Sequence, residues 1–238
     1  VILISPFSTA RDSTAVNASL SGGSFNLFHQ NFSVQKKWKK YQLDFKQAYQ
    51  TSEGYRENSA LDRIYTQLSQ QWQYSNNARL KSILLYSDLN YETPGGLTAA
   101  QALQNPRAAR PGTAVAPGAI EQQAGIENKT FLAGVTNEWD IANGFKHVVA
   151  LSASYTDFKN PFITNYETRL ENSLGLRTYL QYQKQNNGWN WKANAGVEAQ
   201  QTASDINNHE NLGGQKGPEL SVDKLAADQN FLFAHWMA

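Results

Sequence analysis

Long stretches of this sequence alternate apolar and polar residues with a period of two. This period predicts β-strands with one apolar and one polar face, because successive side chains of a strand point to opposite sides. The clearest example is Ser173–Gln200, which contains Asn187-Gly188, a dipeptide typical of two-residue hairpin turns. We therefore predict two long paired strands joined at that turn.

A two-residue turn also fixes which residues face each other across this hairpin. In that register the apolar positions of both strands fall on the same face, as they must if that face avoids water. The predicted pairs are Leu180 with Ala195, Thr178 with Val197, Leu176 with Ala199 and, on the polar face, Arg177 with Glu198. Strands of roughly ten or more residues exceed the usual five or six and approach the length that crosses a membrane at a tilt.

Comparable alternation recurs from Thr14 onward and predicts about ten strands. Short turns at one end of the strands and long loops at the other are typical of outer-membrane barrels. We therefore predict an all-β fold, an antiparallel up-and-down meander of long strands that is part of a large transmembrane β-barrel. Short connections are expected near residues 22–25, 36–40, 75–77, 141–145 and 186–189, and longer ones near residues 52–60, 92–127, 159–172 and 207–229.

Local patterns refine this outline. Leu97–Asn105, inside the longest connection, predicts a helical turn or two. At Asn143-Gly144 the parity of the apolar positions does not fit a two-residue loop, so we expect an odd-length loop or a β-bulge. Lys159–Asn172 and Asn207–Gln229 are expected to be loops, and Asn230–Ala238 the last strand.

The tryptophans indicate a membrane setting. An indole ring favours the boundary between lipid and water, where its N–H can reach water. Tryptophan also ends strands in soluble β-sandwiches, and this alternative stays open. All six tryptophans fall beside a predicted short turn or approach one: Trp38, Trp72, Trp139, Trp189, Trp191 and Trp236.

Composition excludes several kinds of chemistry. The 238 residues include no cysteine, which excludes disulfides, thiolate metal sites and a catalytic thiol. The formal net charge is +1, so nothing indicates a nucleic-acid surface. The four histidines are far apart in sequence, no catalytic motif is present, and no apolar run is long enough for a membrane helix. We therefore expect no enzyme activity, no cofactor and no metal site.

Several short segments resemble one known family, the TonB-dependent outer-membrane receptors of the siderophore type. The resemblance implies that residues 1–12 end a plug domain and its connector, and that residues 13–238 form the N-terminal portion of the barrel. It also implies a location in the bacterial outer membrane, contact with its lipid, and import of a ferric siderophore or similar chelate with energy from TonB. The segments are Val1–Ser5, Gly54-Tyr55-Arg56, Thr93–Thr98, Asn105-Pro106-Arg107, Ala109-Arg110-Pro111 and Lys159–Glu167.

The expected extracellular loops contain candidate ligand-binding residues. Arginine binds carboxylates through a fork of donors, and exposed aromatic rings can stack on aryl groups of a chelate. Structural roles are the alternatives: a pair with a loop carboxylate for Arg56, ordinary solvated charges for the other arginines, and packing for the aromatic residues. The candidates are Tyr55, Arg56, Tyr91, Arg107, Arg110, Phe162 and Tyr166.

Two other functions remain open. A passive porin shares the barrel but needs no plug and no energy source. A surface adhesin could carry the same strands if a second sheet covered their apolar face. The sequence does not distinguish an iron chelate from cobalamin or a glycan. Because both ends look cut from a longer chain, we expect an open curved sheet or a piece that does not function alone.

Overall fold

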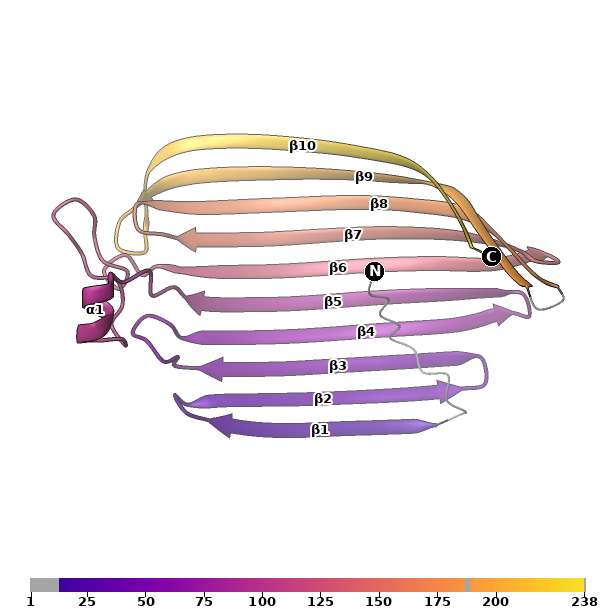
Figure 1. The fold of residues 1–238 in the computed structure, drawn as a ribbon, viewed down its shortest axis with the longest axis horizontal. Coiled ribbons are helices and arrows are strands. Elements are labelled where there is room, and N and C mark those ends of the chain that lie inside the picture. The colour runs from indigo at the N-terminus through magenta and orange to yellow at the C-terminus, as the bar shows by residue number, and fades with distance from the viewer. Residues whose placement is uncertain (1–12, 187–188, 238) are drawn as a thin grey trace.

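The computed structural model describes residues 13–186 and 189–237. In this part of the chain ten strands form one antiparallel sheet, and each strand pairs with the next strand in sequence (Figure 1). The predicted all-β up-and-down meander is therefore confirmed. The strands are β1 (Thr14–Gly23), β2 (Leu27–Trp38), β3 (Tyr41–Ser52), β4 (Leu61–Ser75), β5 (Ala78–Glu92), β6 (Gly125–Ala142), β7 (Phe145–Pro161), β8 (Asn165–Asn186), β9 (Trp189–Asn211) and β10 (Lys216–Met237).

The predicted register of β8 and β9 is confirmed. Leu180 pairs with Ala195, and Thr178 pairs with Val197. The turn itself, Asn187-Gly188, lies outside the described residues, as does the expected plug strand Val1–Ser5. The predicted irregularity near residues 142–144 is a bulge, because the pairing of β6 with β7 shifts between Asp140 and Ala142.

The longest connection contains the predicted helix. Helix α1 (Ala99–Gln104) lies inside Leu97–Asn105 and begins with a capping box, in which Thr98 and Gln101 each bind the other's backbone N–H. Figure 1 places α1 and this connection at the end of the sheet opposite the hairpin turns. Among the described residues, no helix is both long and apolar enough to cross a membrane.

The predicted loop Lys159–Asn172 is wrong, because β7 and β8 continue through it and leave residues 162–164 as the connection. Period-two alternation appears only where one face of a sheet is apolar. Beyond that zone apolar residues are fewer and do not alternate over a long run, so the backbone remains paired without leaving a period-two pattern in the sequence.

The predicted loop Asn207–Gln229 is wrong for the same reason. The connection is residues 212–215, and the last strand begins at Lys216 rather than at Asn230. Pro218 has no N–H to donate, and the pairing of β10 with β9 is shifted in this region. The proline and the change of parity of the apolar positions between Val222 and Leu225 together hide the first half of β10 in the sequence pattern.

The registers define an apolar face, made of alternate residues on every strand. No second layer covers it in the described part of the chain: Leu176, Leu180 and Val197 are 40%, 42% and 42% exposed. From β1 to β8 one row of directly paired residues on this face is apolar throughout: Val16, Val34, Phe45, Leu68, Leu84, Ala133, Ala153 and Leu174. On β9 and β10 the same row continues with two polar residues, Gln201 and Asp228.

Aromatic side chains border the apolar face on both sides. Near the hairpin turns, Trp38 pairs with Tyr41, and Tyr41 pairs with Trp72 across the next strand pair. Trp139 lies near the same end of β6. Towards the other end of β6 lies Phe131. Eight residue steps separate it from Trp139, or about 26 Å along the strand. At the roughly 35–45° tilt of barrel strands this spans about 20 Å of the roughly 25 Å apolar band of outer-membrane barrels.

The opposite, polar face contains hydrogen-bonded and charged side chains. The expected bridge between Arg177 and Glu198 is present, with 3.6 Å between Nη1 and Oε2. Asp44 is fully buried and accepts a hydrogen bond from Gln35 at 2.5 Å. From β1 to β8 the sheet therefore separates an apolar surface from a polar one.

Candidate functional site

Five connections meet at the end of the sheet opposite the tryptophans (Figure 1). We call them the loop assembly. They contain the only cluster of buried apolar side chains found in the described part of the chain, formed by Ala109, Ala119, Ala124 and Ile163. The loop assembly consists of residues 24–26, 53–60, 93–124, 162–164 and 212–215.

Arg56 joins two parts of the loop assembly. Its Nε and Nη2 donate to the carbonyl oxygen of Ala108 at 3.0 and 2.7 Å, and its Nη1 donates to the carbonyl oxygen of Gly95 at 2.8 Å. The guanidinium therefore positions the long connection, and its partners are backbone carbonyls rather than the loop carboxylate considered above.

Asn58 reinforces the same junction. Its Nδ2 donates to the carbonyl oxygens of Thr93 and Ala124 at 3.0 and 2.8 Å. The turn depends on Gly54, whose φ is +77° and where an added Cβ would lie 2.2 Å from the carbonyl oxygen of Ser59. Residues 53–60 are therefore a shaped turn that holds both ends of the long connection.

Gln122 and Asn211 join the long connection to the β7–β8 and β9–β10 connections. Gln122 donates to the carbonyl oxygen of Ile163 at 2.9 Å. Asn211 donates to the carbonyl oxygens of Gln122 and Phe162 at 2.9 and 2.5 Å. Both side chains belong to buried residues, so these bonds make the connections one ordered unit.

Arg107 is the exposed arginine of this surface. Its guanidinium lies over the rings of Phe25 and Tyr55, 5.5 and 5.7 Å from their centroids, and its Nε donates to the carbonyl oxygen of Tyr55 at 3.2 Å. The two rings meet edge to face at 5.5 Å. Tyr55 is 50% exposed and Phe25 is 38% exposed. This arrangement presents a positive charge and two aromatic rings to solvent.

The third candidate arginine is held inside the assembly. Arg110 is half-buried and donates from Nη1 to the carbonyl oxygen of Pro117 at 2.9 Å. Its stem also packs on Gly95, where an added Cβ would lie 2.8 Å from the arginine Cβ. Like Arg56, it therefore has a structural contact that the sequence did not indicate.

Tyr91 and Tyr166 line a common cavity of about 380 Å³, together with Asn58 and Glu127. Tyr166 is buried, and this burial, with a further contribution from the negative charge of Glu127, raises the pKa of its phenol above the ordinary value. Phe162 is 47% exposed and does not line this cavity. The structure thus groups the candidates into Tyr55 with Arg107, Tyr91 with Tyr166, and Phe162 apart.

Sequence analysis missed four residues of this site: Phe25, Asn58, Gln122 and Asn211. Their partners are mostly backbone carbonyls or rings far away in sequence, so no spacing pattern points to them. A weak signal exists for Asn58, because asparagine tolerates the left-handed conformation that it adopts here with φ of 54°.

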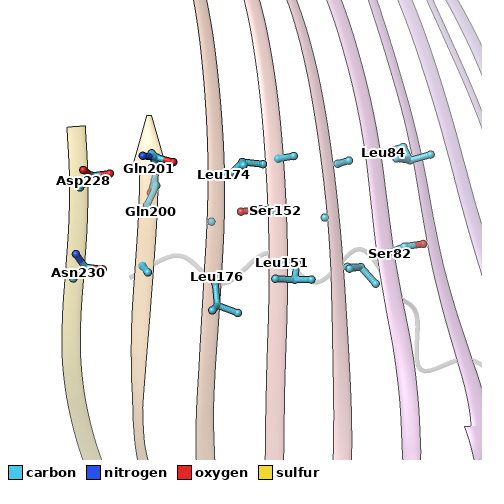
Figure 2. Close-up of a pocket in the computed structure, with 16 residues that line it drawn as sticks. Ser82, Leu84, Leu151, Ser152, Leu174, Leu176, Gln200, Gln201, Asp228 and Asn230 are labelled. Carbon is cyan, nitrogen blue, oxygen red and sulfur yellow. The ribbon is translucent and has the colours of Figure 1, made fainter. Parts of the chain in front are cut away.

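The apolar face has a broad depression of about 880 Å³. Figure 2 shows Leu151 on β7 and Leu174 and Leu176 on β8 around it. The short side chains of Ala133, Ala153 and Ala199 leave the surface hollow there. No candidate ligand-binding residue lines this depression. Its composition suits contact with hydrocarbon rather than with a polar ligand.

The site shows no arrangement for metal chemistry. Within residues 13–186 and 189–237 no three His, Asp or Glu side chains are grouped closely enough to hold a metal ion. Two carboxylates of the loop assembly instead accept hydrogen bonds from the backbone: Glu57 from Ala109 at 3.2 Å and Glu121 from Gly118 at 3.2 Å. The surface can bind a ligand through charge and stacking.

Neither the known protein-family models nor the curated proteins include a match to this chain. Solved structures match its fold at 12% sequence identity. The ferric citrate transporter FecA, in its unliganded form, has a TM-score of 0.70 over 94% of this chain and 35% of its own. The ferripyoverdine receptor of the outer membrane of Pseudomonas aeruginosa has a TM-score of 0.70 over 96% of this chain and 35% of its own. The copper transporter OprC has a TM-score of 0.68 over 98% of this chain and 36% of its own.

The chain thus spans little more than a third of the length of each of these proteins. At this identity the likeness shows the fold alone: the ten-stranded sheet is similar to about a third of each of these structures.

Proposed function

We propose that residues 13–238 form the N-terminal portion of the β-barrel of a bacterial outer-membrane receptor. The receptor binds a ferric siderophore or a similar chelate and imports it with energy from TonB. Residues 1–12 are then the end of the plug domain and its connector, and the TonB-contacting segment belongs to the rest of that domain.

The observation that carries this proposal is the uncovered apolar face. An apolar row across eight strands is unfavourable in water, and aromatic residues border it at a spacing that, on a tilted strand, covers most of the height of the apolar band of a barrel. Lipid supplies the missing contact, and a closed barrel supplies the missing pairing of the edge strands. A soluble adhesin would need a second layer over Leu176 and Leu180, which are exposed in this structure.

The loop assembly supports binding at the extracellular end. We propose that Arg107, Tyr55 and Phe25 contact the ligand, with the guanidinium facing a carboxylate or catecholate and the rings stacking on its aryl groups. Arg56 and Arg110 shape the loops that present them. Tyr91 and Tyr166 form a second candidate surface around their shared cavity.

The test is uptake by the full-length protein in a strain that lacks its own ferric-chelate receptors. We expect saturable uptake of iron supplied as defined ferric chelates, and loss of that uptake when TonB is deleted. Copper supplied in the same assay tests the cargo suggested by one structural neighbour. Uptake that is linear with concentration and independent of TonB, together with steady conductance in a planar bilayer, would instead identify a passive porin.

A further inference from the structure

The β2–β3 hairpin turn is densely basic. Four of the five residues from Lys36 to Lys40 are lysines, and the fifth is Trp38. The neighbouring hairpin turns contain Asn76-Asn77 and Asn143-Gly144 instead. We call Lys36, Lys37, Lys39 and Lys40 the basic turn. Its charge distinguishes it from these other turns at the same end of the sheet.

Three lysines of the basic turn are not neutralised by carboxylates in the part of the chain that the structure describes. Among the described residues, none of the ion pairs includes Lys36, Lys39 or Lys40. The nearest acid by register, Asp44, is paired with Lys46 at 3.4 Å. The basic turn therefore has positive charge available for a partner.

A cavity of about 620 Å³ lies against the basic turn, lined by its lysines together with Trp38, Tyr41 and Trp72. The Lys36 ammonium donates to Thr14 Oγ1 at 2.5 Å and lies 5.6 Å from the centre of the Trp38 ring. Trp38 and Tyr41 contact each other at 5.5 Å. Ammonium groups and aromatic rings thus line the same cavity.

The apolar face begins directly beside this cavity. Lys36 pairs with Leu43, and the next outward-facing pair along the same strands is Val34 with Phe45. A ligand with an anionic head and a hydrocarbon tail would place the head among the lysines and the tail on these residues. A free anion would use only the first half of the site.

We propose that the basic turn and Trp38 bind the phosphate headgroup of an anionic phospholipid in the membrane leaflet at the hairpin-turn end. This inference depends on one part of the proposed function, namely that lipid covers the apolar face. Lysines near a membrane surface each contribute to attraction of anionic lipid, and tryptophan anchors at the same depth. The site gives this side of the barrel a preferred boundary lipid.

The test is native mass spectrometry of the full-length protein with an equimolar mixture of phosphatidylglycerol and phosphatidylethanolamine. The wild-type protein is expected to retain phosphatidylglycerol in excess. In the triple variant Lys36→Gln, Lys39→Gln, Lys40→Gln, affinity for phosphatidylglycerol should fall about fivefold for each lysine removed. Lys146→Gln is the charge-matched control for the single variant Lys36→Gln, because Lys146 lies at the same end and is already 3.6 Å from Asp140.

Each result decides the inference. An unchanged excess of phosphatidylglycerol in the triple variant would overturn it, as would displacement of the lipid by a hundredfold excess of inorganic phosphate. Heat-modifiable gel migration checks that each variant folds. If the triple variant does not fold, the single variant Lys36→Gln is compared with a triple variant in which the same three lysines are replaced by arginine. Only Lys36→Gln should then lose bound phosphatidylglycerol. Chelate uptake in cells is measured in parallel, so normal uptake without lipid preference would reject this inference and leave the proposed function standing.

Discussion

Arg56 donates two hydrogen bonds, at 3.0 and 2.7 Å, to the carbonyl oxygen of Ala108, which lies 52 residues further along the chain. A third bond reaches Gly95 at 2.8 Å. One side chain after β3 therefore fixes the course of the long β5–β6 connection. This relationship explains how more than thirty residues without a strand can present a defined surface.

Replacing Arg56 by alanine should loosen residues 93–124 without unfolding the sheet. Hydrogen bonds from a charged donor contribute about 1.5–3 kcal/mol each, so local opening should become easier by roughly 2–4 kcal/mol. Hydrogen exchange in the connection should then accelerate on the order of 100-fold, while β6 to β9 keep their protection. Arg56→Lys retains the charge but not the fork of donors, and slow exchange in that variant would contradict the role assigned to the guanidinium.

Replacing Arg107 by alanine should weaken chelate binding by about 1–2 kcal/mol, because it removes a cation held over two rings. The sheet should keep its thermal stability, since Arg107 is exposed. Equilibrium binding of a ferric chelate to the full-length protein in detergent measures the effect. Lys129→Ala is a suitable control, since Lys129 lies near the same end of the sheet on the apolar side and is 3.6 Å from Asp88. Equal losses of binding affinity in both variants would indicate a general effect of positive charge rather than a specific site.

A lysine at Leu176 should destabilise the protein in a bilayer by about 2–4 kcal/mol, because it places a charge in the middle of the apolar face. The matched variant is Gln200→Lys, at similar height on the polar face. Urea unfolding in liposomes compares the two. Equal stability of both variants would show that Leu176 does not face hydrocarbon.

Arg177 should contribute more to stability than its ion pair with Glu198 suggests. The pair is 52% and 38% exposed, and such pairs contribute about 0–1 kcal/mol. The guanidinium also lies 4.6 Å from the centre of the Phe233 ring. We expect Arg177→Ala to cost more than Glu198→Ala, with a coupling below about 1 kcal/mol in a double-mutant cycle. A larger coupling would assign the stability to the ion pair instead.

Tyr166 should ionise at higher pH than an exposed tyrosine. Burial, followed by the charge of Glu127, raises its pKa above the ordinary value. A raised pKa means that the folded state holds the proton more tightly, so this contribution to stability is complete below the ordinary pKa of about 10 and is lost as pH rises through the raised value. The difference in phenolate absorbance between wild type and Tyr166→Phe reports it, and a midpoint at or below 10 would contradict the burial.

The sequence pattern predicted the structure correctly where one side of the sheet is apolar. The β8–β9 register, the bulge near Asp140 and helix α1 all follow from local periodicity, parity or capping. It failed at the first half of β10, where the apolar positions change parity between Val222 and Leu225 and Pro218 has no N–H to pair. At the candidate site it selected Tyr55 and Arg107 but could not find Phe25, which precedes them by thirty residues or more and meets them only in space.

The sequence alone determined the two-faced strands and their order, because the period of two and the short turns are local properties that can be recognised without knowing the fold. Only the tertiary structure decided which arginines are held inside the loop assembly and which one remains exposed. Hydrogen bonds such as that from Arg56 to Ala108 join residues far apart in the chain, and their geometry depends on how the long connections pack against one another. The roles of chemically identical side chains are therefore assigned by packing, which no one-dimensional pattern records.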